Sequence, residues 1–74
     1  MNELRALRQQ NLMTQGELAE KLGVRYQTIG TWEMGTARPR PAKMRELCAV
    51  LGVTPAELLT ALDAEESEDV KIAA

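Results

Sequence analysis

The sequence contains no histidine, no phenylalanine and only one cysteine, Cys48. The chain therefore lacks the usual ligands of zinc fingers and of zinc-based catalysis, and it cannot form an internal disulfide. A thiolate at Cys48 would have no histidine to serve as its base. We expect Cys48 to be a small buried apolar residue, and we expect no metal, no cofactor and no enzymatic activity.

Aromatic residues and long apolar runs are also scarce. Only Tyr26 and Trp32 are aromatic, which disfavours a stacking platform for single-stranded nucleic acid. No apolar run approaches the ~20 residues that cross a membrane. The first residues lack the basic region and apolar stretch of a secretory signal. We expect a cytoplasmic protein, with its 74 residues forming one domain around one small core.

The net charge of −2 hides an uneven distribution. Residues 1–62 carry eight Arg and Lys against six acids, a net charge of +2, whereas residues 63–74 carry one lysine and five acids, a net charge of −4. A weakly basic body fits a nucleic-acid binder better than the overall pI of about 5.1 suggests. We expect residues 1–62 to be the domain. Residues 63–74 should be a flexible acidic tail that solubilises the chain, competes with DNA phosphates or binds a protein.

The hydrophobic periodicity predicts an all-α chain of five short helices. Thr14 with Glu17, and Thr54 with Glu57, have the spacing of capping boxes, which predicts the starts of the second and fifth helices. The expected helical segments are about 3–11, 14–22, 26–34, 41–51 and 54–62. Glycines follow the second, third and fourth segments, where a helix commonly ends.

The second and third segments form a helix hairpin with a tight glycine turn, a motif that also occurs in ordinary small bundles. The outer face of the third segment carries short polar side chains rather than a mixture of Glu and Lys. Gln27 can form two hydrogen bonds with an adenine edge, and Thr31 can bond a polar edge or contact a thymine methyl group. Helix-start amides near Gln15, together with Arg38 and Arg40 in the following loop, suit phosphates. These features favour a helix that enters the major groove.

The order and spacing of these elements resemble the lambda-repressor and Cro type of helix-turn-helix domain, also called the XRE family. The resemblance rests on Leu4-Arg5-x-Leu7-Arg8, Met13-Thr14-Gln15-x-Glu17-Leu18-Ala19, Leu22-Gly23-Val24, Thr28-Ile29, Trp32-Glu33-x-Gly35, Leu51-Gly52-Val53-Thr54 and Glu57-Leu58-Leu59. It extends from residue 4 to about residue 60 without a gap. It implies a compact, lambda-repressor-like five-helix bundle in which helices two and three form the helix-turn-helix.

The resemblance also implies roles for individual residues. The residues expected to read base edges are Tyr26, Gln27 and Thr31. The residues expected to contact the DNA backbone, with the two loop arginines at the end, are Gln15, Arg25, Thr28, Arg38 and Arg40. Arg8 and Glu33 match a pair that forms a largely buried ion pair in the family. The alternative for Glu33 is a solvated carboxylate at a helix end.

Three residues depart from the family pattern. Leu12 stands where the family usually has glycine, so the first turn is expected to use Asn11 in the left-handed conformation or a different geometry. Arg25 replaces the usual capping residue before the third helix, which loses a cap of ~1 kcal/mol and offers a phosphate contact instead. Gly30 lies inside the third helix, where it either lets the helix approach DNA closely or is simply tolerated.

The main hypothesis is a sequence-specific transcriptional regulator that binds double-stranded DNA, such as a repressor acting as a homodimer on a palindromic operator. The family resemblance places it at the nucleoid of a prokaryote or in a phage system. Leu58, Leu59 and Leu62 are the expected dimer surface, although all three could instead close the core. The alternative function is an antitoxin-like or adaptor module that keeps this fold and binds a protein through the acidic tail.

Overall fold

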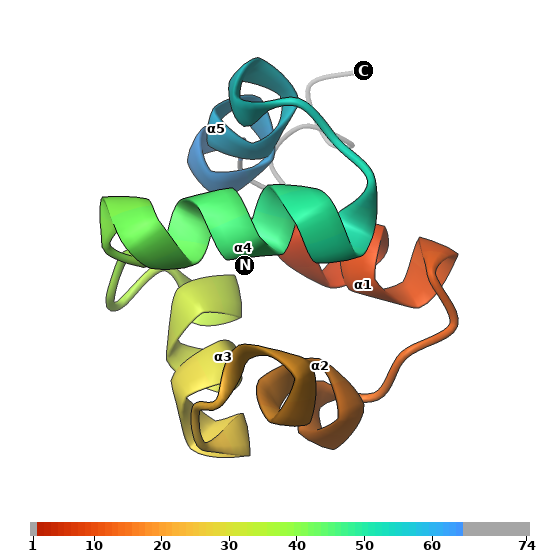
Figure 1. Ribbon diagram of the computed structural model, residues 1–74. Coiled ribbons are helices and arrows are strands. Elements are labelled where there is room, and N and C mark those ends of the chain that lie inside the picture. The colour runs from red at the N-terminus through yellow and green to blue at the C-terminus, as the bar shows by residue number, and fades with distance from the viewer. Residues whose placement is uncertain (1, 65–74) are drawn as a thin grey trace, which may run out of the picture.

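The computed structural model describes residues 2–64, and every regular element among them is a helix. The helices are α1 (Leu4–Gln10), α2 (Gln15–Leu22), α3 (Tyr26–Met34), α4 (Pro41–Leu51) and α5 (Pro55–Asp63). α4 lies between α5 on one side and the α2–α3 pair on the other (Figure 1). The predicted all-α, five-helix fold is confirmed. None of the described helices has the length and apolar character needed to cross a membrane. The expected acidic tail lies outside the described residues, apart from its first two.

Local signals in the sequence set the helix boundaries. The Thr14 hydroxyl accepts a bond from the Glu17 amide at 3.0 Å, and the Glu17 carboxylate accepts one from the Thr14 amide at 2.8 Å. Thr54 and Glu57 repeat this capping box at the start of α5. There the Thr54 amide donates to the Glu57 carboxylate and lowers the pKa of that carboxyl. Gly23 ends α2 with a φ of 70° and turns the chain toward α3.

The core takes an apolar face from each helix. Its buried members are Leu4, Leu18, Ala19, Leu22, Ile29, Trp32, Leu47, Leu51, Leu58 and Leu62. The half-buried Met13 and Val24 pack against this cluster from the two turns that flank α2. α2 packs most extensively against α3. The buried faces pack closely and hold the helix hairpin in place. The opposite side of α3 faces solvent.

Asn2 ties the start of the chain to the end of α3, a feature that the sequence pattern does not predict. Its side chain is almost fully buried, its Nδ2 donates to the Trp32 carbonyl at 2.8 Å, and its Oδ1 accepts from the Leu4 amide at 3.0 Å. Its own backbone amide donates to the Glu33 carbonyl at 3.0 Å. These bonds satisfy the buried amide and join the beginning of α1 to the last turn of α3.

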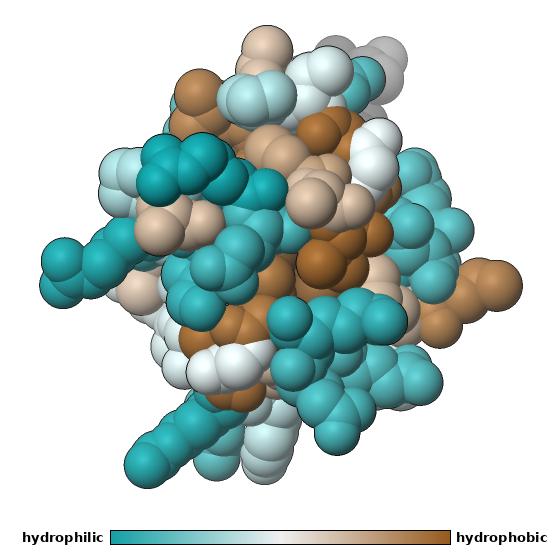
Figure 2. Space-filling view, viewed as in Figure 1, coloured by the Kyte–Doolittle hydropathy of each residue, from teal (hydrophilic) through white to brown (hydrophobic). Residues whose placement is uncertain are grey.

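The three leucines of α5 do not all form a surface, which corrects the expectation above. Leu58 and Leu62 are buried because α5 packs on α1 and α4 through them, so neither is available to a second copy. Leu59 is exposed and borders a small apolar groove of about 70 Å³ beside Met44 and Cys48. Figure 2 shows hydrophobic residues exposed over α4 and α5 on one face of the molecule. Cys48, expected to be a small buried apolar residue, is half-buried there and packs against the core.

The turn between α1 and α2 has an unusual backbone at Leu12. Among the described residues, this is the one non-glycine residue with a positive φ, 58°, and its side chain is 90% exposed. Asn11 is not left-handed; its φ is −94°. Its side chain instead donates to the Leu7 carbonyl at 2.9 Å and to the Leu51 carbonyl at 3.2 Å. The left-handed residue of this turn is therefore Leu12 and not Asn11, whose side chain instead joins α1 to the end of α4.

Replacing Leu12 by glycine is expected to stabilise the protein by about 1 kcal/mol. A residue with a β-carbon is destabilised by ~1–2 kcal/mol in the left-handed region, and glycine removes this strain. Glycine also has more conformational freedom in the unfolded chain, which offsets part of the stabilisation. Little burial is lost because the side chain is exposed. Urea denaturation of the two proteins measures the difference. Leu12→Ala is the matched control: it keeps the β-carbon, so stabilisation by alanine equal to that by glycine would contradict the strain.

Candidate nucleic-acid interface

α3 has one buried face and one exposed face. Its buried residues are Ile29, Trp32 and Glu33. Gln27 and Thr31 lie on the opposite side, where both are exposed, and their spacing of four residues makes them neighbours along the helix surface. The observed range of α3 matches the predicted one. A polar row therefore faces solvent on a helix whose other side is held by the core.

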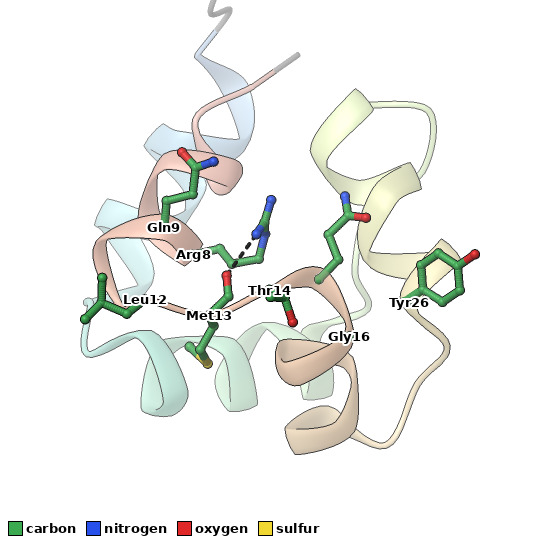
Figure 3. Close-up of a pocket in the computed structure, with 8 residues that line it drawn as sticks. Arg8, Gln9, Leu12, Met13, Thr14, Gly16 and Tyr26 are labelled. Carbon is green, nitrogen blue, oxygen red and sulfur yellow. Dashed lines mark hydrogen bonds between the residues drawn. The ribbon is translucent and has the colours of Figure 1, made fainter.

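A buried ion pair anchors α3 to α1. Arg8 Nε donates to Glu33 Oε2 at 2.6 Å, and Arg8 Nη2 donates to Glu33 Oε1 at 3.3 Å. The two side chains are 10% and 1% exposed. The third nitrogen, Arg8 Nη1, donates to the Met13 carbonyl at 2.9 Å (Figure 3). One guanidinium thus joins α1, the turn before α2, and α3 through a planar donor fork.

Gln15, expected to bind a phosphate, is held by the same carboxylate. Its Nε2 donates to Glu33 Oε1 at 3.1 Å, and the residue is half-buried. An amide nitrogen carries two hydrogens, so one N–H remains for another acceptor. Gln15 is also the first residue of α2, where backbone amides have no partner within the helix. The ion pair therefore orients a side chain that lies beside helix-start amides.

A shallow groove of about 620 Å³ runs between the end of α1 and the starts of α2 and α3. Its lining includes Gln9, Leu12, Gln15, Gly16 and Tyr26. Figure 3 shows Leu12 and Tyr26 at opposite ends of this groove. Its open form and its amide-bearing lining suit an extended anionic chain better than an enclosed small molecule. Within residues 2–64 no group of three potential metal ligands occurs.

The three expected base readers all lie on exposed parts of α3. Tyr26 is 57% exposed and borders the groove. The Thr31 hydroxyl donates to the Thr28 carbonyl at 2.7 Å, so its hydrogen is used while its acceptor lone pairs and its methyl group remain available. Gln27 is exposed and has the full donor and acceptor capacity of an amide. The structure therefore gathers these side chains on one helix.

The expected backbone contacts lie around α3 rather than on it alone. Arg25 is exposed before the first turn and makes no capping hydrogen bond, in keeping with the expected loss of the cap. Thr28 is half-buried. Arg38 and Arg40 are exposed in the connection from α3 to α4. Arg38 forms an ion pair with Asp63 in the last turn of α5, so this guanidinium already has an anionic partner.

One polar contact and one exposed apolar side chain near the hairpin do not follow from the sequence pattern. Lys43 Nζ donates to the Leu22 carbonyl at 2.7 Å and so caps the end of α2 from α4. Its spacing from Glu46 is typical of a solvated helix face, so the sequence carried no signal for this contact. The apolar side chain is Met34. It is 57% exposed and seven residues beyond Gln27, a spacing that places it on the outer face of α3.

Comparison with known proteins identifies one family. A family model described as helix-turn-helix matches residues 4–58, which takes in α1 to α4 and the first turn of α5. No curated protein and no solved structure matches the chain significantly. The matched range coincides with the segments that carry the sequence resemblance, and it includes the three helices that border the groove.

Neutralising Glu33 should destabilise the protein by about 3–5 kcal/mol, because Arg8 would stay buried without its counter-charge. Glu33→Gln keeps the size of the side chain and isolates the effect of charge in urea denaturation. Glu46→Gln is the matched control. That carboxylate is half exposed beside Lys43, so its loss should cost less than about 1 kcal/mol. Equal costs for the two variants would contradict the role assigned to the buried pair.

Proposed function

We propose that this chain, which belongs to the XRE-type helix-turn-helix family of DNA-binding regulators, recognises a specific double-stranded operator with α3 in the major groove. The observation that carries the proposal is the two-sided character of α3. Gln27 and Thr31 face solvent, while the core and the Arg8–Glu33 pair hold the opposite side. A helix with its side chains is about 10–12 Å across, which matches the ~12 Å major groove.

The chemistry of the exposed side chains supports a division of roles. Gln27 would form two hydrogen bonds with an adenine edge, and Tyr26 would contact the neighbouring base from the groove side. Thr31 would accept a hydrogen bond from an amino group on a base, since its own hydrogen is donated to Thr28. The proposed contacts to the DNA backbone are Gln15, Arg25, Thr28, Arg38 and Arg40. Such contacts fix register without reading sequence.

The proposed active form is a homodimer. One small domain covers little DNA, whereas two copies on half-sites about 34 Å apart would give useful affinity. Leu59, with the half-buried Met44 and Cys48 beside it, supplies exposed apolar surface for contact between copies. We further propose residues 1–62 as the DNA-binding domain, residues 63–74 as an acidic tail that begins in the last turn of α5, and the cytoplasm as the location. Repression by occupying a promoter is the expected mode of action.

Selection of bound duplexes from a random pool tests this function directly. The expected result is a palindromic motif whose half-sites lie one helical turn, about 10 base pairs, apart. An asymmetric single half-site would count against the homodimer. If no motif is enriched, the DNA proposal fails. The alternative, an antitoxin-like or adaptor protein that uses this fold to bind another protein, would then be favoured.

On the selected operator, Gln27→Ala should weaken binding by ~1–3 kcal/mol and relax the preference at one base pair in each half-site. The side chain is exposed, so the free energy of unfolding should barely change. Gln10→Ala, which removes an exposed glutamine at the end of α1, is the matched control and should leave binding unchanged. Fluorescence anisotropy with the selected operator and its single-base variants measures both effects. A uniform loss on all of these duplexes would exclude base reading by Gln27.

Arg38→Ala should weaken binding to all sequences and reduce the slope of log affinity against log salt by about one. Asp63→Asn should act in the opposite direction. It removes the carboxylate that competes with DNA phosphates for the Arg38 guanidinium. Both variants are measured on operator and random duplex over a salt series. Weaker binding by Asp63→Asn would contradict the competition and indicate that the ion pair instead holds Arg38 in its binding position.

A further inference from the structure

Beside Gln27 and Thr31 on α3, one half-buried position has no side chain and one exposed position has an apolar side chain. Gly30 lies between Gln27 and Thr31 in the sequence, and Met34 follows Gly30 by four residues. Side chains on a helix tilt toward its N-terminus, so a residue at position 34 covers the turn that contains Gly30. Met34 is 57% exposed. We call this pair the Gly30–Met34 notch, an apolar spot within a polar row.

Packing within the protein does not explain Gly30. A β-carbon at this position would meet no atom closer than Gln15 Nε2, at 3.8 Å, which is ordinary van der Waals contact. The backbone of Gly30 is regular helix without a positive φ, so alanine would fit. Glycine is among the least favourable residues inside a helix. The fold therefore gives no reason for the missing methyl group, and the one atom that a β-carbon would approach belongs to Gln15, a proposed contact to the DNA backbone.

We infer that the Gly30–Met34 notch receives the 5-methyl group of a thymine. This inference rests on the proposed DNA-binding function and adds a specificity determinant to it. The thymine methyl is the apolar group that base edges present in the major groove. Because Gly30 has no β-carbon, this methyl group can approach the helix backbone more closely than it could beside alanine. The flexible, polarizable thioether of Met34 can close around it. Gln27 and Thr31 flank the notch and would bond the adjoining base edges.

The test uses the complete chain and the selected operator, in which each thymine is replaced in turn by deoxyuridine. This replacement removes the methyl group and leaves base pairing intact. Wild-type protein should bind about fourfold more weakly at one thymine in each half-site, the loss expected for one buried methyl group. Gly30→Ala should bind the thymine operator about tenfold more weakly, because its new methyl group meets the thymine methyl. The same variant should regain affinity on the deoxyuridine operator, where that space is empty.

Two further variants separate recognition from folding. Met34→Ala should reduce the preference for thymine over deoxyuridine at that position toward one. Thr60→Ala, an exposed substitution on α5 that also favours helix, should leave the preference unchanged. Thermal unfolding shows that each variant is folded before binding is measured.

The outcomes distinguish the notch from the proposed function as a whole. A motif with no methyl-dependent thymine, or Gly30→Ala binding the thymine operator as tightly as wild type, overturns the notch while operator recognition stands. Loss of affinity by Gly30→Ala without recovery on deoxyuridine also overturns it, because the obstruction would then not be the thymine methyl. If the random pool yields no motif, the proposed function fails and the notch fails with it.

Discussion

The buried ion pair between Arg8 and Glu33 is the interaction on which the arrangement of α1, α2 and α3 depends. Its guanidinium also holds the Met13 carbonyl, and its carboxylate also accepts from Gln15. Buried pairs often contribute little net stability because both charges lose their hydration. Their strongest effect is geometric, since few arrangements of three helices satisfy all of these groups at once. The pair therefore joins α3 both to α1 and to the start of α2.

The two ion pairs near the proposed interface differ in strength and in use. Arg8 and Glu33 are shielded from water, so salt screens their attraction little. Removing either partner would leave the other charge buried and uncompensated. Arg38 and Asp63 are about half exposed or more, so their attraction is weak and screened. The Arg8–Glu33 pair therefore holds α3 from its buried side, whereas the Arg38–Asp63 pair can open without disturbing the core. A phosphate that takes Arg38 from Asp63 would disturb only the surface.

The sequence predicts the helices well because their boundaries are local. The Thr14–Glu17 capping box and Gly23 each act within one turn of the chain. Side-chain contacts between distant residues could not be predicted in the same way, because they depend on the assembled fold. Arg38 with Asp63, Lys43 with the Leu22 carbonyl, and the burial of Asn2 all belong to this class.

The five leucines and alanines of α5 show a related limit, since periodicity does not separate core residues such as Leu58 from exposed ones such as Leu59. Among the proposed DNA contacts, the exposure of Gln27 followed from helical spacing, whereas the bond from Gln15 to Glu33 required the tertiary structure.

The separation of the two faces of α3 has a consequence for how such a protein can evolve. Gln27, Thr31 and Met34 lie outside the core, so substitutions at these positions leave the packing of Ile29 and Trp32 intact. Under the proposed function, a gene duplicate can therefore change its operator preference through single mutations, without compensating changes in the rest of the chain. Paralogues with different targets can then share this fold, because mutations at the exposed positions of α3 do not alter the stability of the core.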